Sequence, residues 1–345
     1  MTAKTSLFAN QLRHELAARN RQYARRRAHV ESYGGEPVIV YAPEGERHGN
    51  FFDPAYAAIA ARPEWMRRFD KVHAQGARCL PKAERRWREL DSSTSSDALL
   101  MNIFCTPCVL SSASLRNALG LDNNVTPVYG WKARVPLANG RFDRTEVDLL
   151  LGSLLIEAKL TEGDFQNCEA AAIEPYRDLD AVFDRALLPR VEIPPKRRKA
   201  PAEFPENYSQ EFESVVVDPE TDPRDFPAEI AAHLVESNRI ATSSPEPFEC
   251  GYASYQLIRN VLAAYATENS FCVIHDARRP DLREEWYRVM AAVRSAELRT
   301  RLKVLTWQEL AVFLPVELQA FLDAKYGIVA PGRIPSPVRE ESLDE

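Results

Sequence analysis

The feature that most constrains the fold is a pair of strand-like runs joined by a tight turn. Residues 145–151 and 154–160 are both rich in leucine and other apolar residues, and Gly152-Ser153 stands between them. Short apolar runs that are bounded by turn residues predict β-strands. We therefore expect an antiparallel hairpin over residues 145–160.

Four charged residues interrupt these apolar runs, namely Glu146 and Asp148 in the first and Glu157 and Lys159 in the second. Side chains alternate between the two faces of a strand, so Glu157 and Lys159 share one face of the second strand while Ile156 and Ala158 point into the core. Folding the hairpin at its turn can bring Asp148 of the first strand close to this pair. Burying such charges without partners would cost several kcal/mol, so their position needs an explanation.

A divalent metal ion between Asp148 and Glu157 would supply one. Mg²⁺ prefers oxygen ligands, usually one or two carboxylates with waters and substrate phosphate, and the backbone carbonyl of Ala158 would add a further oxygen. The metal, Mg²⁺ or Mn²⁺, would polarise a phosphate and help to deprotonate a water. Lys159 would hold that water and stabilise charge in the transition state. The alternative is a surface hairpin whose charged face is only solvated.

This segment resembles the PD-(D/E)xK phosphodiesterase superfamily, which includes many restriction endonucleases, lambda-type exonucleases and Holliday-junction resolvases. Asp148 matches the first acidic residue of the motif, and Glu157 and Lys159 match its ExK part. Val147 occupies the place of the usual proline, which is commonly missing. The resemblance implies hydrolysis of DNA phosphodiester bonds by a Mg²⁺-dependent deoxyribonuclease, with 5′-phosphate and 3′-hydroxyl products.

Three blocks of the chain are similar to a bacterial restriction-endonuclease-like family. They cover residues 95–104, 157–162 and 255–260. That family commonly has Ser-Ser-Gln where Asp97 stands here. The resemblance implies the fold and a role in restriction, defence or DNA repair, but no DNA target. It leaves the oligomeric state open, a dimer included.

Four further residues are candidates for supporting roles. By resemblance to the exonuclease-type relatives, Gln256 on the helix after the ExK strand would support the active site, where its amide would orient the water or contact a phosphate oxygen. Arg259 lies three residues on, near the same helix face, and would clamp a phosphate. Glu162 would assist the metal or hold Lys159, and Asp97 is a weaker candidate. The alternatives are an ordinary polar helix residue for Gln256 and a solvated or salt-bridged arginine for Arg259, and Glu146 is expected to be a peripheral or surface residue.

The order of expected elements indicates an α/β fold. We expect a restriction-endonuclease-like core with a mixed central sheet flanked by helices. The expected helices cover residues 6–30, 54–69, 81–90, 98–104, 165–188, 252–267, 282–298 and 307–313, and the expected strands cover 125–137, 145–151, 154–160, 270–275 and 302–305. Asn139-Gly140 is a turn signal, and the serine-rich run before residue 98 is a helix start signal.

Composition divides the chain into four regions. Residues 1–90 form a helical N-terminal extension, and residues 91–165 with 248–315 form the nuclease core. Residues 166–247 are a Pro-rich, acidic insertion rather than a separate domain, with ten prolines between residues 189 and 247. Residues 316–345 are a C-terminal tail.

The charge distribution agrees with a nucleic-acid partner despite a net charge of −6. Residues 203–229 hold nine acids and one base, and residues 340–345 hold four acids. The rest of the chain has a net charge of +6, as a protein that binds a phosphate backbone needs. This charge distribution predicts DNA as a partner. The sparse cysteines and the lack of a secretory signal predict a cytoplasmic protein. No apolar run is long enough to span a membrane, so we expect no membrane partner.

Other motifs carry less weight. Cys105 and Cys108 form a CxxC, but no second CxxC or histidine pair completes a metal site. The arginine runs at residues 25–27 and 196–199 are solvated surfaces or DNA contacts. Without a Walker loop or Rossmann glycine pattern, ATP is not an expected partner. A different function also fits, in which the nuclease fold has dormant catalysis and serves as a DNA-binding or complex-assembly module.

Overall fold

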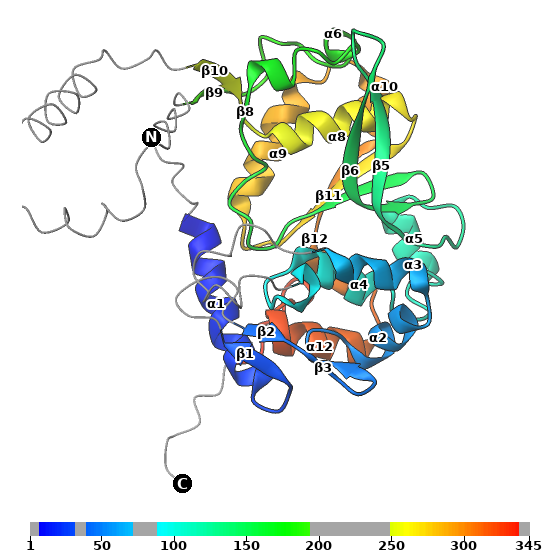
Figure 1. Cartoon of the computed structure of the whole chain (residues 1–345), viewed down its shortest axis with the longest axis vertical. Helices are drawn as coiled ribbons and strands as arrows, with labels where there is room; N and C mark the ends of the chain where they lie inside the picture. Colours follow the sequence, from blue (N-terminus) through cyan, green and yellow to red (C-terminus); the bar gives the residue numbers. More distant parts are fainter. Residues whose placement is uncertain (1–6, 32–38, 72–87, 194–248, 338–345) are drawn as a thin grey trace, which may run out of the picture. The chain divides into compact units, whose positions relative to one another are not determined.

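The computed structural model describes residues 7–31, 39–71, 88–193 and 249–337 (Figure 1). The chain divides into two units, residues 1–191 with 251–345 and residues 192–250. The first unit contains the elements discussed below. In the part of the chain that is described, no helix is long and apolar enough to cross a membrane.

A five-stranded mixed sheet forms the centre of the first unit. Its order is β12-β11-β7-β6-β5. Strands β5, β6 and β7 pair antiparallel, whereas β7, β11 and β12 pair parallel. The bounds are Val128–Pro136 for β5, Phe142–Leu151 for β6, Leu154–Ala158 for β7, Ser270–His275 for β11 and Leu302–Thr306 for β12. The hairpin and the mixed α/β fold expected from the sequence are confirmed.

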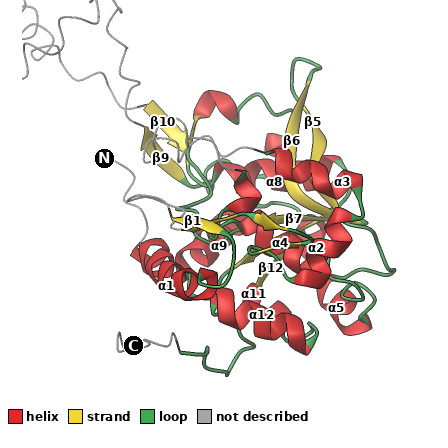
Figure 2. Ribbon diagram, turned by 60° about the horizontal axis from the view of Figure 1, so that its bottom comes forward, coloured by secondary structure: helices red, strands yellow, loops and turns green. Residues whose placement is uncertain are grey.

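Helices cover both faces of this sheet (Figure 1). Alternate residues of β7 and β11 point to opposite faces, so that Ile156 and Ile274 join one core cluster while Leu155 and Val273 join another. The first cluster is filled from α4 (Ser96–Phe104), α5 (Ala113–Leu119) and α11 (Trp307–Ala311), and the second from α8 (Tyr255–Ala266) and α9 (Pro280–Ala292). Figure 2 shows β7 between α8 and α4 from a second direction.

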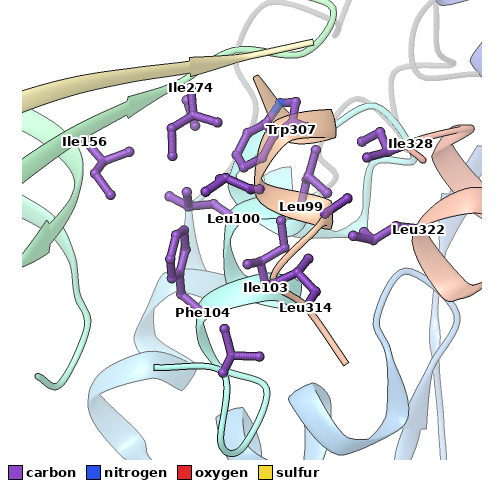
Figure 3. Close-up of a cluster of buried hydrophobic side chains, with 14 of the residues drawn as sticks. Leu99, Leu100, Ile103, Phe104, Ile156, Ile274, Trp307, Leu314, Leu322 and Ile328 are labelled. Carbon is purple, nitrogen blue, oxygen red and sulfur yellow. The ribbon is translucent and has the colours of Figure 1, made fainter. Parts of the chain in front are cut away.

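Helix α4 shows how the first face is packed. Its side chains Leu99, Leu100, Ile103 and Phe104 lie in one buried cluster with Ile156 and Ile274 of the sheet and with Trp307 (Figure 3). Ser95 caps the helix, since its side chain accepts a hydrogen bond from the backbone N–H of Ala98 at 3.0 Å. The serine-rich start signal in the sequence is confirmed.

The first and the last helix of the described residues both pack on this same face. Helix α1 (Leu7–Ala24) contributes Leu12 and Leu16 to the first cluster, and α12 (Val316–Tyr326) contributes Leu318 and Leu322. The segment expected as a C-terminal tail from residue 316 therefore begins with a helix that belongs to the core.

The N-terminal extension is broken into shorter elements than expected. The single helix predicted over residues 54–69 is instead α2 (Asp53–Ala60), α3 (Pro63–Met66) and the 3-10 turn η1 (Arg67–Asp70). The break lies at Pro63, which starts α3 because a proline cannot donate the helical hydrogen bond. The described residues of this extension also contain four short strands, namely β1 (His29–Glu31), β2 (Ile39–Tyr41), β3 (Pro43–Glu44) and β4 (Arg47–His48). Most of the helix expected over 81–90 lies outside the described residues, and Glu89–Asp91 form the 3-10 turn η4.

The prediction of a helix over residues 165–188 is wrong. This segment contains only β8 (Cys168–Glu169), the 3-10 turn η5 (Ala170–Ala172) and α6 (Leu179–Val182). Ile173, Tyr176, Leu179 and Val182 are buried, and their spacing of three residues imitates a helix. Pro175 lies among them, and its carbonyl accepts a hydrogen bond from Ala138 of the neighbouring strand connection instead.

The expected insertion falls mostly outside the described residues. Strand β9 (Arg190–Ile193) precedes the residues that are not described, and β10 (Glu249–Tyr252) follows them. Strands β8, β10 and β9 form a second, smaller sheet in the order β8-β10-β9. The chain then continues through α8, β11, α9, α10 (Ala296–Thr300) and β12. The helix expected over 282–298 is interrupted between α9 and α10.

Candidate active site

The candidate site lies where the β6–β7 hairpin opens. Regular pairing of the two strands ends at Leu149 opposite Ile156. Just beyond, Asp148 Oδ2 accepts a hydrogen bond from the backbone N–H of Ala158 at 2.8 Å. The carboxylate thus takes the place of a strand partner, which fixes it beside the ExK strand.

The ExK strand is held from both sides after it leaves the hairpin. The backbone N–H of Lys159 donates to the carbonyl of Ile274 on β11 at 2.8 Å. The carbonyl of Lys159 accepts from Nε1 of the buried Trp307 at 3.0 Å. These two hydrogen bonds fix the backbone on either side of the lysine side chain.

Glu157 and Lys159 form a buried ion pair. Lys159 Nζ donates to Glu157 Oε1 at 2.6 Å, and the two side chains are 6% and 5% exposed. Asn260 Nδ2 of α8 donates to the second oxygen of Glu157 at 2.9 Å. Both oxygens of this carboxylate therefore have donors in the described structure.

The electrostatics of the three residues are coupled. Burial, followed by the charges of Glu157 and Asp97, raises the pKa of Asp148 well above its ordinary value, against the opposing effect of Lys159. Burial alone would lower the pKa of Lys159, but the carboxylates of Glu157, Glu162 and Asp148 outweigh it and raise that pKa. A further cation beside Asp148 would therefore stabilise its charged form.

A cavity of about 190 Å³ joins these side chains to others from four parts of the chain. Its acidic lining residues outnumber its lysines, six to two, so an anion entering it would meet a net negative charge. The lining residues are Lys71, Glu89, Ser96, Asp97, Asp148, Glu157, Ala158, Lys159, Glu162, Asp164, Gln256 and Gln166.

Gln256 is one of the lining residues predicted from the sequence. Its backbone N–H donates to the carbonyl of Phe165 at 3.0 Å, which holds the first turn of α8 against the end of the ExK segment. Its side-chain oxygen Oε1 is buried and has no hydrogen-bond partner within the described residues. A buried acceptor without a donor is costly, so this oxygen is ready to accept from a water or a ligand.

The other supporting candidates are placed differently. Glu162 lines the cavity and accepts from Ser96 Oγ at 2.5 Å and from the backbone N–H of Leu160 at 2.6 Å, so it holds the segment after the ExK strand to the start of α4. Arg259 lies over the ring of Tyr255 at 5.0 Å and donates to its hydroxyl at 3.3 Å. It is not among the described residues that line the cavity.

Two cations from the N-terminal extension reach the site without any signal in the sequence. Arg68 donates to Asp97 Oδ2 through Nη2 at 2.7 Å and through Nε at 3.1 Å, and it also donates to Glu146 at 2.8 Å. Lys71 lies 3.3 Å from the same Asp97 oxygen and 2.9 Å from Glu89. Asp97 is thus the central residue of an ion-pair network at the cavity, and Glu146 belongs to this network through Arg68.

Asn260 is a further residue of the site that was not predicted from the sequence. It lies four residues after Gln256, one helical turn along α8, and this spacing could have indicated that both amides reach the same side of the helix.

The residues present fit a cation with few protein ligands. Among the described residues, no group of three or more His, Cys, Asp or Glu side chains is arranged to hold a metal. Mg²⁺ commonly uses only one or two carboxylates and keeps several waters. Asp148 and Glu157, with a buried acceptor on Gln256 beside them, provide such an arrangement.

The CxxC motif lies elsewhere. Cys105 is buried and lies 3.1 Å from the hydroxyl of Tyr129, whereas Cys108 is exposed, and both are free thiols. Burial raises the pKa of Cys105 to about 12, so this thiol is protonated at neutral pH.

Comparison with known protein families gives one match. A model of the family described as Restriction Endonuclease associating with ARP matches residues 17–327 of the 345-residue chain. No curated protein and no solved structure matches the chain. The match spans the N-terminal extension from residue 17 onward, the central sheet and α12, so it includes every residue of the candidate site.

Proposed function

The chain belongs to the family described as Restriction Endonuclease associating with ARP, and from this and the site geometry we propose that it is a Mg²⁺- or Mn²⁺-dependent deoxyribonuclease of the PD-(D/E)xK type. The observation that carries the proposal is the single cavity in which Asp148, Glu157, Lys159 and Gln256 meet. These residues come from β6, from β7 and its end, and from α8.

The acidic lining of the cavity supports a metal-dependent reaction. A DNA phosphate would be repelled by an excess of carboxylates unless cations entered with it. Asp148 and Glu157 would hold the ion, with the carbonyl of Ala158 as a further oxygen ligand. When bound, the metal would lower the pKa of a water and polarise the phosphate.

The protein groups have separate tasks in this proposal. Asp148 is oriented by the backbone N–H of Ala158, and Glu157 by Asn260. Lys159 places a positive charge beside the phosphate, where it stabilises negative charge that develops in the transition state. Gln256 accepts a hydrogen bond from the attacking water through its unpaired Oε1 and so orients it.

The test is a cleavage assay with plasmid, linear and branched DNA in Mg²⁺, Mn²⁺ or EDTA. We expect cutting only with metal, products with 5′-phosphates, and a loss of activity by orders of magnitude in Lys159→Ala. Lys132→Ala is the matched control, because this lysine lies on the neighbouring strand β5 and is 61% exposed. Cleavage that survives both EDTA and Lys159→Ala would exclude the mechanism.

A second candidate function is a catalytically dormant DNA-binding or complex-assembly module. The observation that favours it is the closed Glu157–Lys159 pair, in which both carboxylate oxygens have protein donors. The family description also names an association with ARP. A wild-type protein that binds DNA but cuts none of the substrates with any metal would support this function.

A further inference from the structure

A second and larger cavity lies in the N-terminal part of the fold. It has a volume of about 760 Å³ and shares no described lining residue with the candidate active site. It opens where the end of α1, the β3–β4 hairpin, the start of α2 and one side of α12 meet. Its lining residues are Tyr23, Arg26, Arg27, Glu44, Arg47, His48, Gly49, Phe51, Phe52, Asp53, Pro54, Ala320, Phe321 and Ala324.

One wall of this cavity is aromatic. The rings of Tyr23 and Phe52 both contact Phe321, with centroid distances of 6.0 and 5.7 Å. Tyr23 and Phe52 are only half-buried, so part of each ring remains accessible. Ala320 and Ala324, one turn apart on α12, contribute only methyl groups beside this wall, which keeps the space in front of it open.

The rest of the cavity carries guanidinium groups. Arg26 and Arg27 come from the arginine run that follows α1, and Arg47 comes from β4. The Arg27 guanidinium lies 3.5 Å from the centroid of the Tyr23 ring and donates to the Tyr23 carbonyl at 2.5 Å, so it is held in place. Arg47 lies 3.4 Å from Asp53 and is 77% exposed, so it is able to turn toward a ligand.

Aromatic rings beside arginines match the chemistry of a nucleotide. Bases stack on aromatic side chains whatever their sequence, and the planar guanidinium group binds phosphate through paired hydrogen bonds. Glu44 and Asp53 at the same cavity add acceptors for amino or hydroxyl groups of a nucleotide. The volume falls within the range of roughly 300–1,000 Å³ that is typical of small-ligand sites.

We propose that this cavity binds one nucleotide, with its base against Tyr23, Phe52 and Phe321 and its phosphate on Arg26, Arg27 and Arg47. The ligand is either a free nucleotide or a single nucleotide unit of a nucleic-acid strand, because both present the same base and phosphate. The proposal does not depend on the proposed nuclease function, since no residue of the candidate active site takes part in it.

The test measures binding to the full chain by calorimetry in EDTA, so that no cleavage occurs. The probes are AMP, the four deoxynucleoside monophosphates, a short single-stranded oligonucleotide, the corresponding nucleosides and inorganic phosphate. We expect nucleotides to bind about tenfold or more tightly than nucleosides or phosphate, as loss of a charged hydrogen bond or of stacking would give. Binding of monophosphates indicates a free nucleotide, and binding of the oligonucleotide alone indicates a strand.

Two variants localise the binding. The double variant Arg26→Gln and Arg47→Gln changes exposed residues and removes two phosphate donors, and Ala324→Trp fills the cavity from an exposed position on α12. Each should weaken nucleotide binding at least about tenfold. Arg21→Gln is the control, because Arg21 is an exposed arginine of α1 outside the described cavity lining. The proposal is overturned if no probe binds the wild type at millimolar concentration, or if both variants bind as the wild type does while their thermal melts are unchanged.

Discussion

Replacing each of the two candidate metal ligands by its amide should affect stability differently, with a loss expected only for Glu157→Gln. In the metal-free protein, Asp148 is a carboxylate whose charge is opposed by burial and by Glu157 and Asp97. Asp148→Asn removes that charge and keeps an oxygen that accepts from Ala158. Glu157 instead pairs directly with the buried Lys159 at 2.6 Å, so Glu157→Gln leaves the ammonium group without the carboxylate in contact with it.

The expected magnitudes follow from these contacts. Breaking a buried ion pair by removing one partner costs about 3–5 kcal/mol, and we expect about 3 kcal/mol for Glu157→Gln because the amide oxygen still accepts from Lys159. At about 2.1 cal/mol/K per residue, this lowers the Tm by roughly 4 °C. Asp148→Asn should leave the free energy of unfolding unchanged or higher at pH 7, with each unit of raised pKa worth about 1.4 kcal/mol.

The sign of the pH dependence gives an independent check. Because the folded-state pKa of Asp148 lies above its unfolded value, its contribution to stability is complete below the unfolded value and is lost as pH rises through the folded value. The metal-free wild type should therefore lose this contribution with rising pH from about pH 4 upward. In Asp148→Asn this part of the pH dependence should be absent.

Thermal melts in EDTA and in Mn²⁺ measure these effects on one set of proteins. Metal that binds only the folded state should stabilise the wild type by about 2.7 kcal/mol at one hundred times its Kd, and both variants far less. Equal metal-induced shifts in wild type, Asp148→Asn and Glu157→Gln would place the metal elsewhere. Destabilisation of Asp148→Asn as large as that of Glu157→Gln in EDTA would refute the electrostatic reasoning.

Three further predictions concern residues around the site. Arg68→Ala should lower the free energy of unfolding by about 3 kcal/mol, because the nearly buried Asp97 loses its main ion-pair partner. Chemical denaturation measures this loss, and adding Asp97→Asn to the Arg68→Ala variant should recover part of the lost stability. Trp307→Phe removes the hydrogen bond to the Lys159 carbonyl, so it should cost about 1–3 kcal/mol and reduce kcat more than it raises KM in the cleavage assay, whereas an equal effect on both would argue against a positioning role. Leu100→Ala creates a cavity in the core and should cost about 2–5 kcal/mol, while the Mn²⁺-induced shift in Tm stays at the wild-type value.

The hairpin could be predicted from the sequence because its signals are local. The apolar runs, the Gly152-Ser153 turn and the alternation that puts Glu157 and Lys159 on one face all lie within sixteen residues. The strand over residues 270–275 was equally clear, since its four consecutive apolar residues, Phe271 to Ile274, suit a position inside a sheet. The role of these residues in metal binding stays a prediction.

The ion-pair network could not be predicted in the same way. Arg68 and Lys71 meet Asp97 across more than twenty residues of chain, and Arg68 meets Glu146 across 78. No periodicity links such positions, because the contact depends on how the N-terminal extension packs on the sheet. The helix expected over 165–188 failed for a related reason, since the regular spacing of its buried residues arises from contacts with β5 and α8 rather than from a helix.

The place at which the long Pro-rich segment enters the fold has an evolutionary consequence. Strands β9 and β10 are neighbours in one small sheet, so the chain leaves and re-enters the core at adjacent points, between the ExK strand and the helix that bears Gln256. The entropic cost of closing a loop at such a point depends only weakly on the loop's length, and it rises by about 0.6 kcal/mol for each doubling of that length. The connection between β9 and β10 is therefore a point at which a lineage can lengthen, shorten or exchange sequence at little cost to the fold that holds the candidate site.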